Sequence, residues 1–303
     1  MKKKNIKKLI SILVAVMVLG FYYIFDTYQL GPTTDSTNKR IEEAVVTSNE
    51  NLEVTFLDVG QADSILLECG SNNMLIDAGN NEDGEKIVSY LQEEGITDFS
   101  YVVGTHPHED HIGGLDDIIN NFQIETFYMP DVVTTTKTFE DVLTALEKNN
   151  VLLSIPSAGD TFTLGDAKVK VLYVGTEEES DLNDTSIILK VTYKGVSFLF
   201  TGDASTKIEN TISKEDLKST VLKVGHHGSK TSTNKTLLES INPSYAVISV
   251  GKDNQYKHPE EEVLSLLNER NIKTYRTDED ETIKMITDGS NIEINTLKTD
   301  TNG

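Results

Sequence analysis

The sequence has little that could cross-link or brace the fold covalently. Among its 303 residues there is one cysteine, Cys69, and no tryptophan. A single thiol excludes an internal disulfide, and it also excludes a zinc site built from several cysteines. Because Cys69 closes the run Leu66-Leu67-Glu68-Cys69, we expect it at the end of a core strand.

Basic residues are also scarce: 27 lysines and arginines face 49 aspartates and glutamates, for a net charge of −22. Five of the lysines lie in the first eight positions, so the rest of the chain is more acidic still. Because phosphate affinity comes mostly from Lys and Arg, this balance argues against tight nonspecific binding to nucleic acid. It does not exclude a phosphate ester held by metal ions, and it also suits a soluble exported protein.

Long apolar runs are missing except at the N-terminus, where Leu9–Phe25 follows the lysines. The run is at the short end of the roughly 17–25 residues that span a bilayer. The positive-inside rule then puts the lysines in the cytoplasm and the rest of the chain outside. Residues 1–26 predict a signal anchor in the cell membrane. A cleaved signal peptide, which would release a secreted protein, is the alternative, although no clear cleavage site follows.

Residues 27–51 are polar with no strong period and predict a linker. From residue 52 to 303, strand-like and helix-like segments alternate without a change in composition, which predicts a single α/β domain. One expected helix is 139–149, with Thr138 as its N-cap, and one expected hairpin turns at Lys194-Gly195. This order favours two packed sheets with helices outside.

The six histidines are strongly clustered. Three fall within the run Thr105-His106-Pro107-His108-Glu109-Asp110-His111, and His226 and His227 are adjacent. His106 and His108, two residues apart at a strand end, can aim both imidazoles at one point. With Asp110 and His111 they form a ligand set for zinc or manganese with an open position for water. Gly113-Gly114 lets the backbone come close to this site.

Two further apolar strands end in an acid: Leu75-Ile76-Asp77 and Phe198–Asp203. An acid at such a place meets a cation or orients a metal ligand, although an ordinary turn aspartate remains an equal alternative for Asp77. The strand before His226-His227 also ends in polar ligands. Strand ends of this kind build a site at one rim of an α/β sandwich.

These segments resemble the metallo-β-lactamase superfamily, whose pattern is an early Asp, then His-x-His-x-Asp-His, then later Asp and His ligands. More narrowly, Phe56–Ser64, Thr105–Leu115, Asn183–Ser186, Leu222–Ser229 and Val247–Pro259 resemble the extracytoplasmic domain of ComEC-family competence proteins. The resemblance implies an αββα metallo-β-lactamase sandwich, here preceded by one N-terminal membrane-spanning segment, and a hydrolase domain over residues 52–303.

The resemblance also implies two divalent metal ions, Zn²⁺ or Mn²⁺. His106 and His108 would bind the first, Asp110 and His111 the second, and Asp203 would bridge them. His227 is slightly favoured over His226 to complete the second site, which leaves His226 for a substrate oxygen. No histidine lies between His111 and Asp203, where many members have one. Asn183 or Asp184 stands there instead, and an oxygen ligand shifts the preference toward manganese.

Catalysis is therefore expected from Asp110, His226 and His258, the last as an acid to the leaving group. Ser229 and Lys230 are candidates to bind substrate, as are Lys223 and Lys252. The alternatives are that Ser229 caps a helix, that His258 closes a loop, and that the lysines are solvated.

The leading functional prediction is an extracytoplasmic two-metal phosphodiesterase, a nuclease acting on DNA. A cell-surface phosphoesterase such as a phosphorylcholine esterase is the alternative, although the chain lacks tryptophan for an aromatic cage. A noncatalytic DNA-uptake module is the third hypothesis. Expected partners are nucleic acid or another phosphodiester and the membrane; no protein partner is predicted.

Overall fold

The computed structural model describes residues 51–212 and 214–298, all within the unit Ser48–Gly303. The predicted signal anchor (1–26) and nearly all of the predicted linker (27–51) lie outside the described residues. Within the described part of the chain, no helix is both long and apolar enough to cross a membrane.

The first sheet has eight strands in the order β15-β14-β1-β2-β3-β4-β5-β6. Strands β3 to β6 are parallel, so their carboxyl ends lie along one edge. The bounds are β1 Leu52–Phe56, β2 Ser64–Cys69, β3 Asn72–Ala78, β4 Asp98–Val103, β5 Gln123–Tyr128, β6 Leu153–Ser154, β14 Ile283–Thr287 and β15 Ile292–Thr296.

The second sheet has seven strands in the order β13-β12-β11-β10-β9-β8-β7, of which β10 to β13 are parallel. The predicted turn at Lys194-Gly195 is confirmed, since it joins the antiparallel strands β9 and β10. The bounds are β7 Thr161–Leu164, β8 Ala167–Tyr173, β9 Ile188–Tyr193, β10 Val196–Phe200, β11 Val221–Lys223, β12 Tyr245–Ile248 and β13 Lys273–Arg276.

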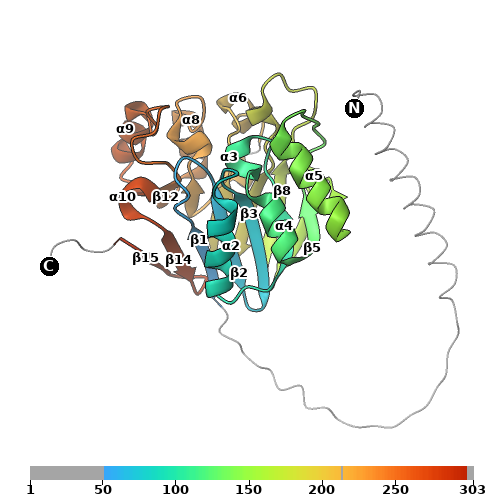
Figure 1. Ribbon diagram of the computed structural model, residues 1–303. Coiled ribbons are helices and arrows are strands. Elements are labelled where there is room, and N and C mark those ends of the chain that lie inside the picture. Colours follow the sequence, from blue (N-terminus) through green and yellow to red (C-terminus); the bar gives the residue numbers. More distant parts are fainter. Residues whose placement is uncertain (1–50, 213, 299–303) are drawn as a thin grey trace, which may run out of the picture. The chain divides into compact units, whose positions relative to one another are not determined.

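Helices cover the outer face of each sheet (Figure 1). On the first sheet these are α2 Gly84–Glu93, α4 Leu115–Asn121 and α5 Lys137–Asn149. On the second they are α6 Thr206–Glu209, α7 Lys214–Leu217, α8 Lys235–Ile241 and α9 Glu261–Glu269. The shorter elements are α3 Glu109–Ile112, α10 Thr277–Asp280, η1 Leu182–Thr185 and η2 Gly225–Gly228. The predicted α/β sandwich with helices outside is confirmed.

Strand β2 shows how the sequence builds these layers. Ile65 and Leu67 face the core between the two sheets, while Leu66 packs into the core beneath the helices of the first sheet. A strand buried on both faces reads as an unbroken apolar run instead of an alternating one. Cys69 is buried at the end of this strand, as predicted.

One predicted helix boundary is wrong. Thr136, not Thr138, caps α5: its side-chain oxygen accepts a hydrogen bond from Phe139 N at 3.3 Å. Thr138 lies in the first turn, where its hydroxyl donates to the Asn81 side chain over 3.2 Å. Both threonines could act as caps by residue type, and only the path of the chain decides between them.

Candidate metal centre

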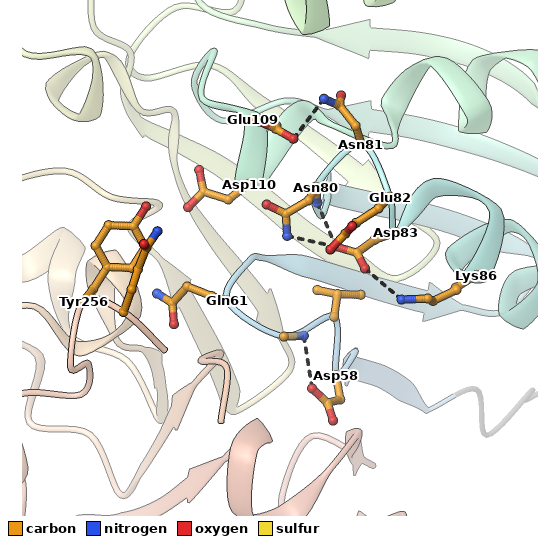
Figure 2. A pocket seen from close by; sticks show the side chains of 13 residues that line it. Asp58, Gln61, Asn80, Asn81, Glu82, Asp83, Lys86, Glu109, Asp110 and Tyr256 are labelled. Carbon is orange, nitrogen blue, oxygen red and sulfur yellow. Dashed lines mark hydrogen bonds and ion pairs between the residues drawn. The ribbon is translucent and has the colours of Figure 1, made fainter. Parts of the chain in front are cut away.

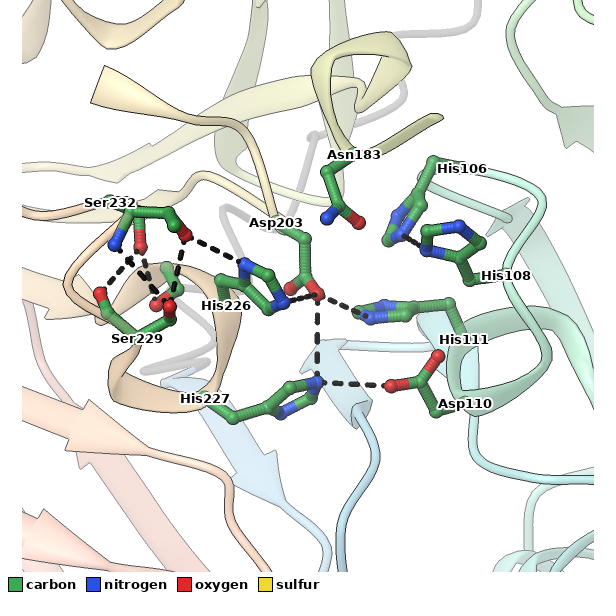
Figure 3. Close-up of polar contacts among 12 residues, drawn as sticks. His106, His108, Asp110, His111, Asn183, Asp203, His226, His227, Ser229 and Ser232 are labelled. Carbon is green, nitrogen blue, oxygen red and sulfur yellow. Dashed lines mark hydrogen bonds and ion pairs between the residues drawn. The ribbon is translucent and has the colours of Figure 1, made fainter. Parts of the chain in front are cut away.

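The predicted ligands converge at one edge of both sheets, where parallel strands of each sheet end (Figure 3). Asp77 is near the end of β3, and His106 follows β4. From the second sheet, Asp203 follows β10 and the adjacent histidines follow β11 in η2. The carboxyl-end rim is where open parallel sheets usually place their ligands.

Two glycines let the histidine-rich loop approach the first sheet closely. A Cβ on Gly113 would lie 2.2 Å from the backbone of Asn80 and Asn81, and one on Gly114 would lie 2.5 Å from the Ala78 carbonyl oxygen. Without side chains, the two backbone N–H groups donate to Gly79 O and Ala78 O. The predicted close approach at Gly113-Gly114 is therefore present, and it fixes α3 beside the end of β3.

Asp77 is 1 % exposed and holds the loop through three contacts. Its Oδ1 accepts a hydrogen bond from Thr105 N, and its Oδ2 accepts one from Thr105 Oγ1, both at 2.7 Å. The same Oδ2 lies 2.8 Å from His111 Nδ1. Its φ of +60° is rare for a residue other than glycine. This geometry fits the predicted role of orienting a metal ligand, because it fixes which nitrogen of His111 is free.

Four side chains place ligand atoms within 4.8 Å of one another: Asp110, His111, Asp203 and His227. The Asp203 Oδ2 atom lies 3.3 Å from His111 Nε2 and 3.7 Å from His227 Nε2, and Asp110 Oδ2 lies 3.3 Å from His227 Nε2. Three buried atoms, His111 Nε2, His227 Nε2 and Asp203 Oδ1, have no hydrogen-bond partner within the described structure. Buried polar atoms left over in this way fit a metal site.

A second group of ligands lies beside the first. His106 Nε2 and His108 Nδ1 are 3.0 Å apart, and the rings of His106 and His111 are 4.2 Å apart. Figure 3 shows Asn183 beside His106 and Asp203. The Asn183 Oδ1 atom is also buried without a hydrogen-bond partner in the described residues. These atoms could hold another cation, with Asp203 between the two positions.

The electrostatics of the cluster show strong coupling between its acids and imidazoles. Burial lowers the pKa of His111, but the carboxylates of Asp203, Asp77 and Asp110 outweigh it and raise that pKa well above its ordinary value. Burial acts against ionisation of Asp203 too, yet the nearby His111 and His227 hold its pKa well below the usual range. The Asp203 carboxylate is therefore held in its ionised form, balanced by imidazole protons that a metal ion would have to displace.

The loop that carries His226 and His227 has an unusual backbone. Both residues have positive φ, 48° and 51°. His227 is buried and its Nδ1 donates to Ser249 O at 2.9 Å, which aims Nε2 at Asp110 and Asp203. The His226 side chain is 25 % exposed and its Nε2 lies 3.7 Å from Asp203 Oδ2. This placement supports His227 as the metal ligand and leaves His226 beside the open side of the cluster.

The remaining candidates lie around this loop. Ser229 is buried and its Oγ accepts from Thr231, whose hydroxyl contacts His226 Nδ1 at 3.0 Å. Lys230 is exposed and pairs with Glu260 at 3.0 Å. The ring of His258 meets the His226 ring edge-on at 5.6 Å, and burial followed by the charge of His226 lowers the pKa of His258. Ser229 thus supports His226, and His258 stands next to the cluster.

The sequence interpretation missed a buried ion pair beneath the cluster. Lys223, expected to be solvated or to meet phosphate, is 1 % exposed, and its Nζ lies 2.9 Å from Asp63 Oδ2. Asp63 Oδ1 lies 3.5 Å from His227 Nδ1. The available signal was a lysine inside the apolar run Val221–Val224, since an unpaired charge is not tolerated there.

A pocket of about 790 Å³ opens beside Asp110 (Figure 2). It is bounded on one side by the loop after β1 and on the other by the loop before α2. Its lining residues are Asp58, Val59, Gly60, Gln61, Asn80, Asn81, Glu82, Asp83, Lys86, Glu109, Asp110, Gln255 and Tyr256. A substrate that reaches the cluster from this side meets a lining rich in carboxylates and amides.

The two-sheet sandwich and its buried histidine–aspartate cluster define a metal-binding α/β protein with its site at one rim. Residues 57–252 match the model of the metallo-beta-lactamase superfamily, and the chain belongs to this superfamily of hydrolases.

The relatives of this chain include competence proteins, as the sequence resemblance predicted. It is 30 % identical over 252 residues to ComE operon protein 3 of Bacillus subtilis (strain 168), covering 77 % of this chain and 32 % of that protein. It is also 30 % identical over 231 residues to competence protein ComA of Neisseria gonorrhoeae, covering 74 % of this chain and 31 % of that protein. The chain thus spans about a third of the length of these relatives.

A solved structure shows the same fold. The metallo-beta-lactamase fold protein YhfI from Bacillus subtilis superposes with a TM-score of 0.53 at 12 % identity, over 75 % of this chain and 96 % of that one. At this identity the likeness concerns the fold alone.

Proposed function

We propose that this protein is an extracytoplasmic two-metal phosphodiesterase, a nuclease that acts on DNA. The observation that carries the proposal is the cluster of Asp110, His111, Asp203 and His227. Their ligand atoms lie within 4.8 Å of one another, and those of His111, Asp203 and His227 include buried atoms without a hydrogen-bond partner in the described residues. The relatives named as a competence protein and as a recombination protein support DNA as the proposed substrate.

The residues divide into two groups around Asp203. In the proposal His106, His108 and Asn183 hold one divalent ion, and Asp110, His111 and His227 hold the other. When bound, such a pair of ions supplies an activated water and stabilises charge on the attacking and leaving oxygens. Asp77 keeps the His111 Nδ1 proton in place. In the proposal His226, at the exposed side of the cluster, contacts a substrate oxygen.

The identity of the metal is also part of the proposal. Asn183 offers an amide oxygen where a histidine would supply nitrogen, and oxygen ligands favour harder ions. We therefore propose manganese as the more effective ion, with zinc as the alternative. The N-terminal apolar run supports a membrane anchor with the sandwich outside the cell, and this location is proposed on the sequence alone.

A second function is favoured by one specific observation, the acidic lining of the pocket beside Asp110. Carboxylates with Tyr256 suit a cationic group, as in phosphorylcholine. However, Tyr256 is the only aromatic side chain among the lining residues, so the pocket does not form an aromatic cage. A phosphorylcholine esterase is therefore the second candidate.

The test is nuclease activity of the full chain, purified in a mild detergent and loaded with manganese or zinc. Single-stranded and duplex DNA are the substrates, and p-nitrophenyl phosphorylcholine is assayed in parallel. The matched control is Asp110→Asn, which keeps the side-chain shape but removes the charge. We expect metal-dependent DNA cleavage in the parent. Its rate should fall by at least about 100-fold in the control, because losing one group that stabilises charge in the transition state has an effect of this size.

Three other outcomes would overturn the proposal. Cleavage of the choline ester without cleavage of DNA would establish the second candidate. Metal-loaded protein that binds DNA and cleaves neither substrate would establish a noncatalytic DNA-uptake module. Cleavage that survives in Asp110→Asn would place the activity outside this cluster.

A further inference from the structure

Among the residues that the structure describes, Tyr256 is the exposed aromatic side chain that lines the pocket beside the metal cluster. It is 58 % exposed. It lines the pocket together with Asp110, and Figure 2 shows the Tyr256 ring and the Asp110 carboxylate on the same hollow. The ring is therefore open to a substrate that is held at the cluster.

A row of rings connects Tyr256 to the cluster. The Tyr256 ring stacks on His258 with 5.8 Å between centroids and 24° between planes. His258 in turn meets His226 edge-on, and His226 Nε2 lies 3.7 Å from Asp203 Oδ2. One face of Tyr256 is supported by this stack, so a planar group could stack on the side of the ring that His258 leaves uncovered.

The loop that presents Tyr256 is held in place by hydrogen bonds. The Asn254 side chain bonds to both ends of the turn: its Nδ2 donates to Gly251 O and to His258 O, and its Oδ1 accepts from His258 N. Gly251 N donates to the Gln61 side chain at 3.1 Å, which ties the loop to the segment after β1 that also lines the pocket. A platform fixed before binding loses little entropy when a ligand stacks on it.

The charges of the pocket decide what kind of group can enter. Asp58, Glu82, Asp83 and Glu109 line it, and the single lysine of the lining, Lys86, lies 3.4 Å from Asp83. A run of phosphates would be repelled from such a wall, whereas an uncharged heterocycle with N–H donors meets carboxylate and amide acceptors. A nucleobase therefore fits this pocket better than a run of phosphates does.

We propose that Tyr256, backed by His258, is a stacking platform for one unpaired nucleobase, and that the substrate is single-stranded DNA or a frayed strand end. A base inside a duplex is already stacked on both faces and cannot use such a platform. This proposal rests on the proposed nuclease function.

The test compares KM and kcat of the manganese-loaded full chain on three substrates: a single-stranded oligonucleotide, the same strand with abasic positions, and the duplex. For Tyr256→Ala we expect KM for the single strand to rise at least about fivefold, because this is the smallest effect usually produced by losing the stacking contact of one base. KM for the abasic strand should not change, and kcat on both should be kept within about twofold. Tyr256→Phe, which retains the ring, should behave as the parent.

A second measurement does not depend on turnover. Because the chain has no tryptophan, Tyr256→Trp introduces a single fluorescent reporter at the platform. We expect its emission to be quenched by a single-stranded phosphorothioate oligonucleotide and not by the abasic version.

The failures of the two proposals are distinguishable. If the parent protein cleaves no DNA, the nuclease function fails. If it cleaves DNA and Tyr256→Ala leaves KM unchanged, or raises it equally for the abasic strand, only the platform is overturned. Quenching by choline and not by the oligonucleotide would assign the ring to a quaternary ammonium instead.

Discussion

The Lys223 ammonium and the Asp63 carboxylate form an ion pair that is almost fully buried beneath the candidate metal centre. The two groups are 2.9 Å apart, and their side chains are 1 % and 2 % exposed. Lys223 Nζ also donates to Val224 O at 3.1 Å. Asp63 brings a further carboxylate close to Asp77 and His111, so Lys223 offsets negative charge next to the ligands.

Removing one partner of this pair should be much more harmful than removing both. We expect Lys223→Met to lower the free energy of unfolding by about 3–5 kcal/mol, because it leaves Asp63 buried and uncompensated. The double variant Asp63→Leu/Lys223→Met should recover at least half of that loss. Urea unfolding of metal-free protein measures both, and a double variant no more stable than Lys223→Met would contradict this account.

This ion pair could not be predicted from the sequence, whereas the metal ligands could. The strand ends and the His106–His111 run indicated the superfamily, because ligand spacing and apolar strands are local features. Lys223 and Asp63 are far apart in the sequence, and only the fold brings the end of β11 close to the residue before β2. The charge of Lys223 does not show whether the side chain is exposed or buried, but its apolar sequence neighbours indicate a buried position.

Asp77 should control metal affinity without touching the metal. In Asp77→Asn one carboxylate oxygen becomes an N–H donor, and it can no longer accept from His111 Nδ1. We expect metal affinity to fall by about 10- to 100-fold, the usual effect of losing a group that orients a ligand. Competition with a chromophoric chelator measures the change. Asp98→Asn, an exposed position at the opposite end of β4, is the control and should keep the parent affinity.

The same cluster explains which ligands could be foreseen and which could not. The ligands around His111 could be predicted because they lie in one contiguous run of the sequence. For Asp77 the sequence left two roles open, a turn residue or a group that orients a ligand, and its three contacts with His111 and Thr105 decide for the second. The choice between His226 and His227 needed the positive φ angles of both residues. No sequence pattern predicts which of two adjacent imidazoles such a turn points inward.

Metal loading should release protons near neutral pH. Nearby carboxylates raise the pKa of His111 and of His227 above the ordinary histidine value, against the opposing effect of burial. These shifts favour the cationic imidazolium form of both side chains in the metal-free protein, and a metal ion that binds there must displace a proton. Metal affinity should then fall as the pH falls through these pKa values.

Calorimetric titration with manganese at pH 7 in buffers of different ionisation enthalpy gives the number of protons released. We expect at least about one proton per protein molecule, since two ligands are involved. An observed enthalpy that does not depend on the buffer would show that the two histidines are neutral before metal binds.

Glu209 should make the fold less stable as the pH rises. It is 1 % exposed, both of its oxygens accept from Thr233 N, and burial raises its pKa from 4.5 to about 8. The folded protein thus keeps a proton that the unfolded chain loses. The stability that the protonated Glu209 side chain contributes to the folded protein is fully present below pH 4.5 and is lost progressively up to about pH 8.

Glu209→Gln keeps an acceptor for Thr233 N and removes the ionisation. Relative to the parent, the variant should therefore gain about 3 to 4 kcal/mol in free energy of unfolding between pH 5 and pH 8, since one pKa unit is worth about 1.4 kcal/mol. Urea unfolding of metal-free protein at the two pH values measures this difference. The exposed Glu269→Gln controls for the loss of one surface carboxylate. Equal pH dependence in Glu209→Gln and the parent would mean that Glu209 is ionised in the folded protein, with water or a cation reaching it beside Thr233.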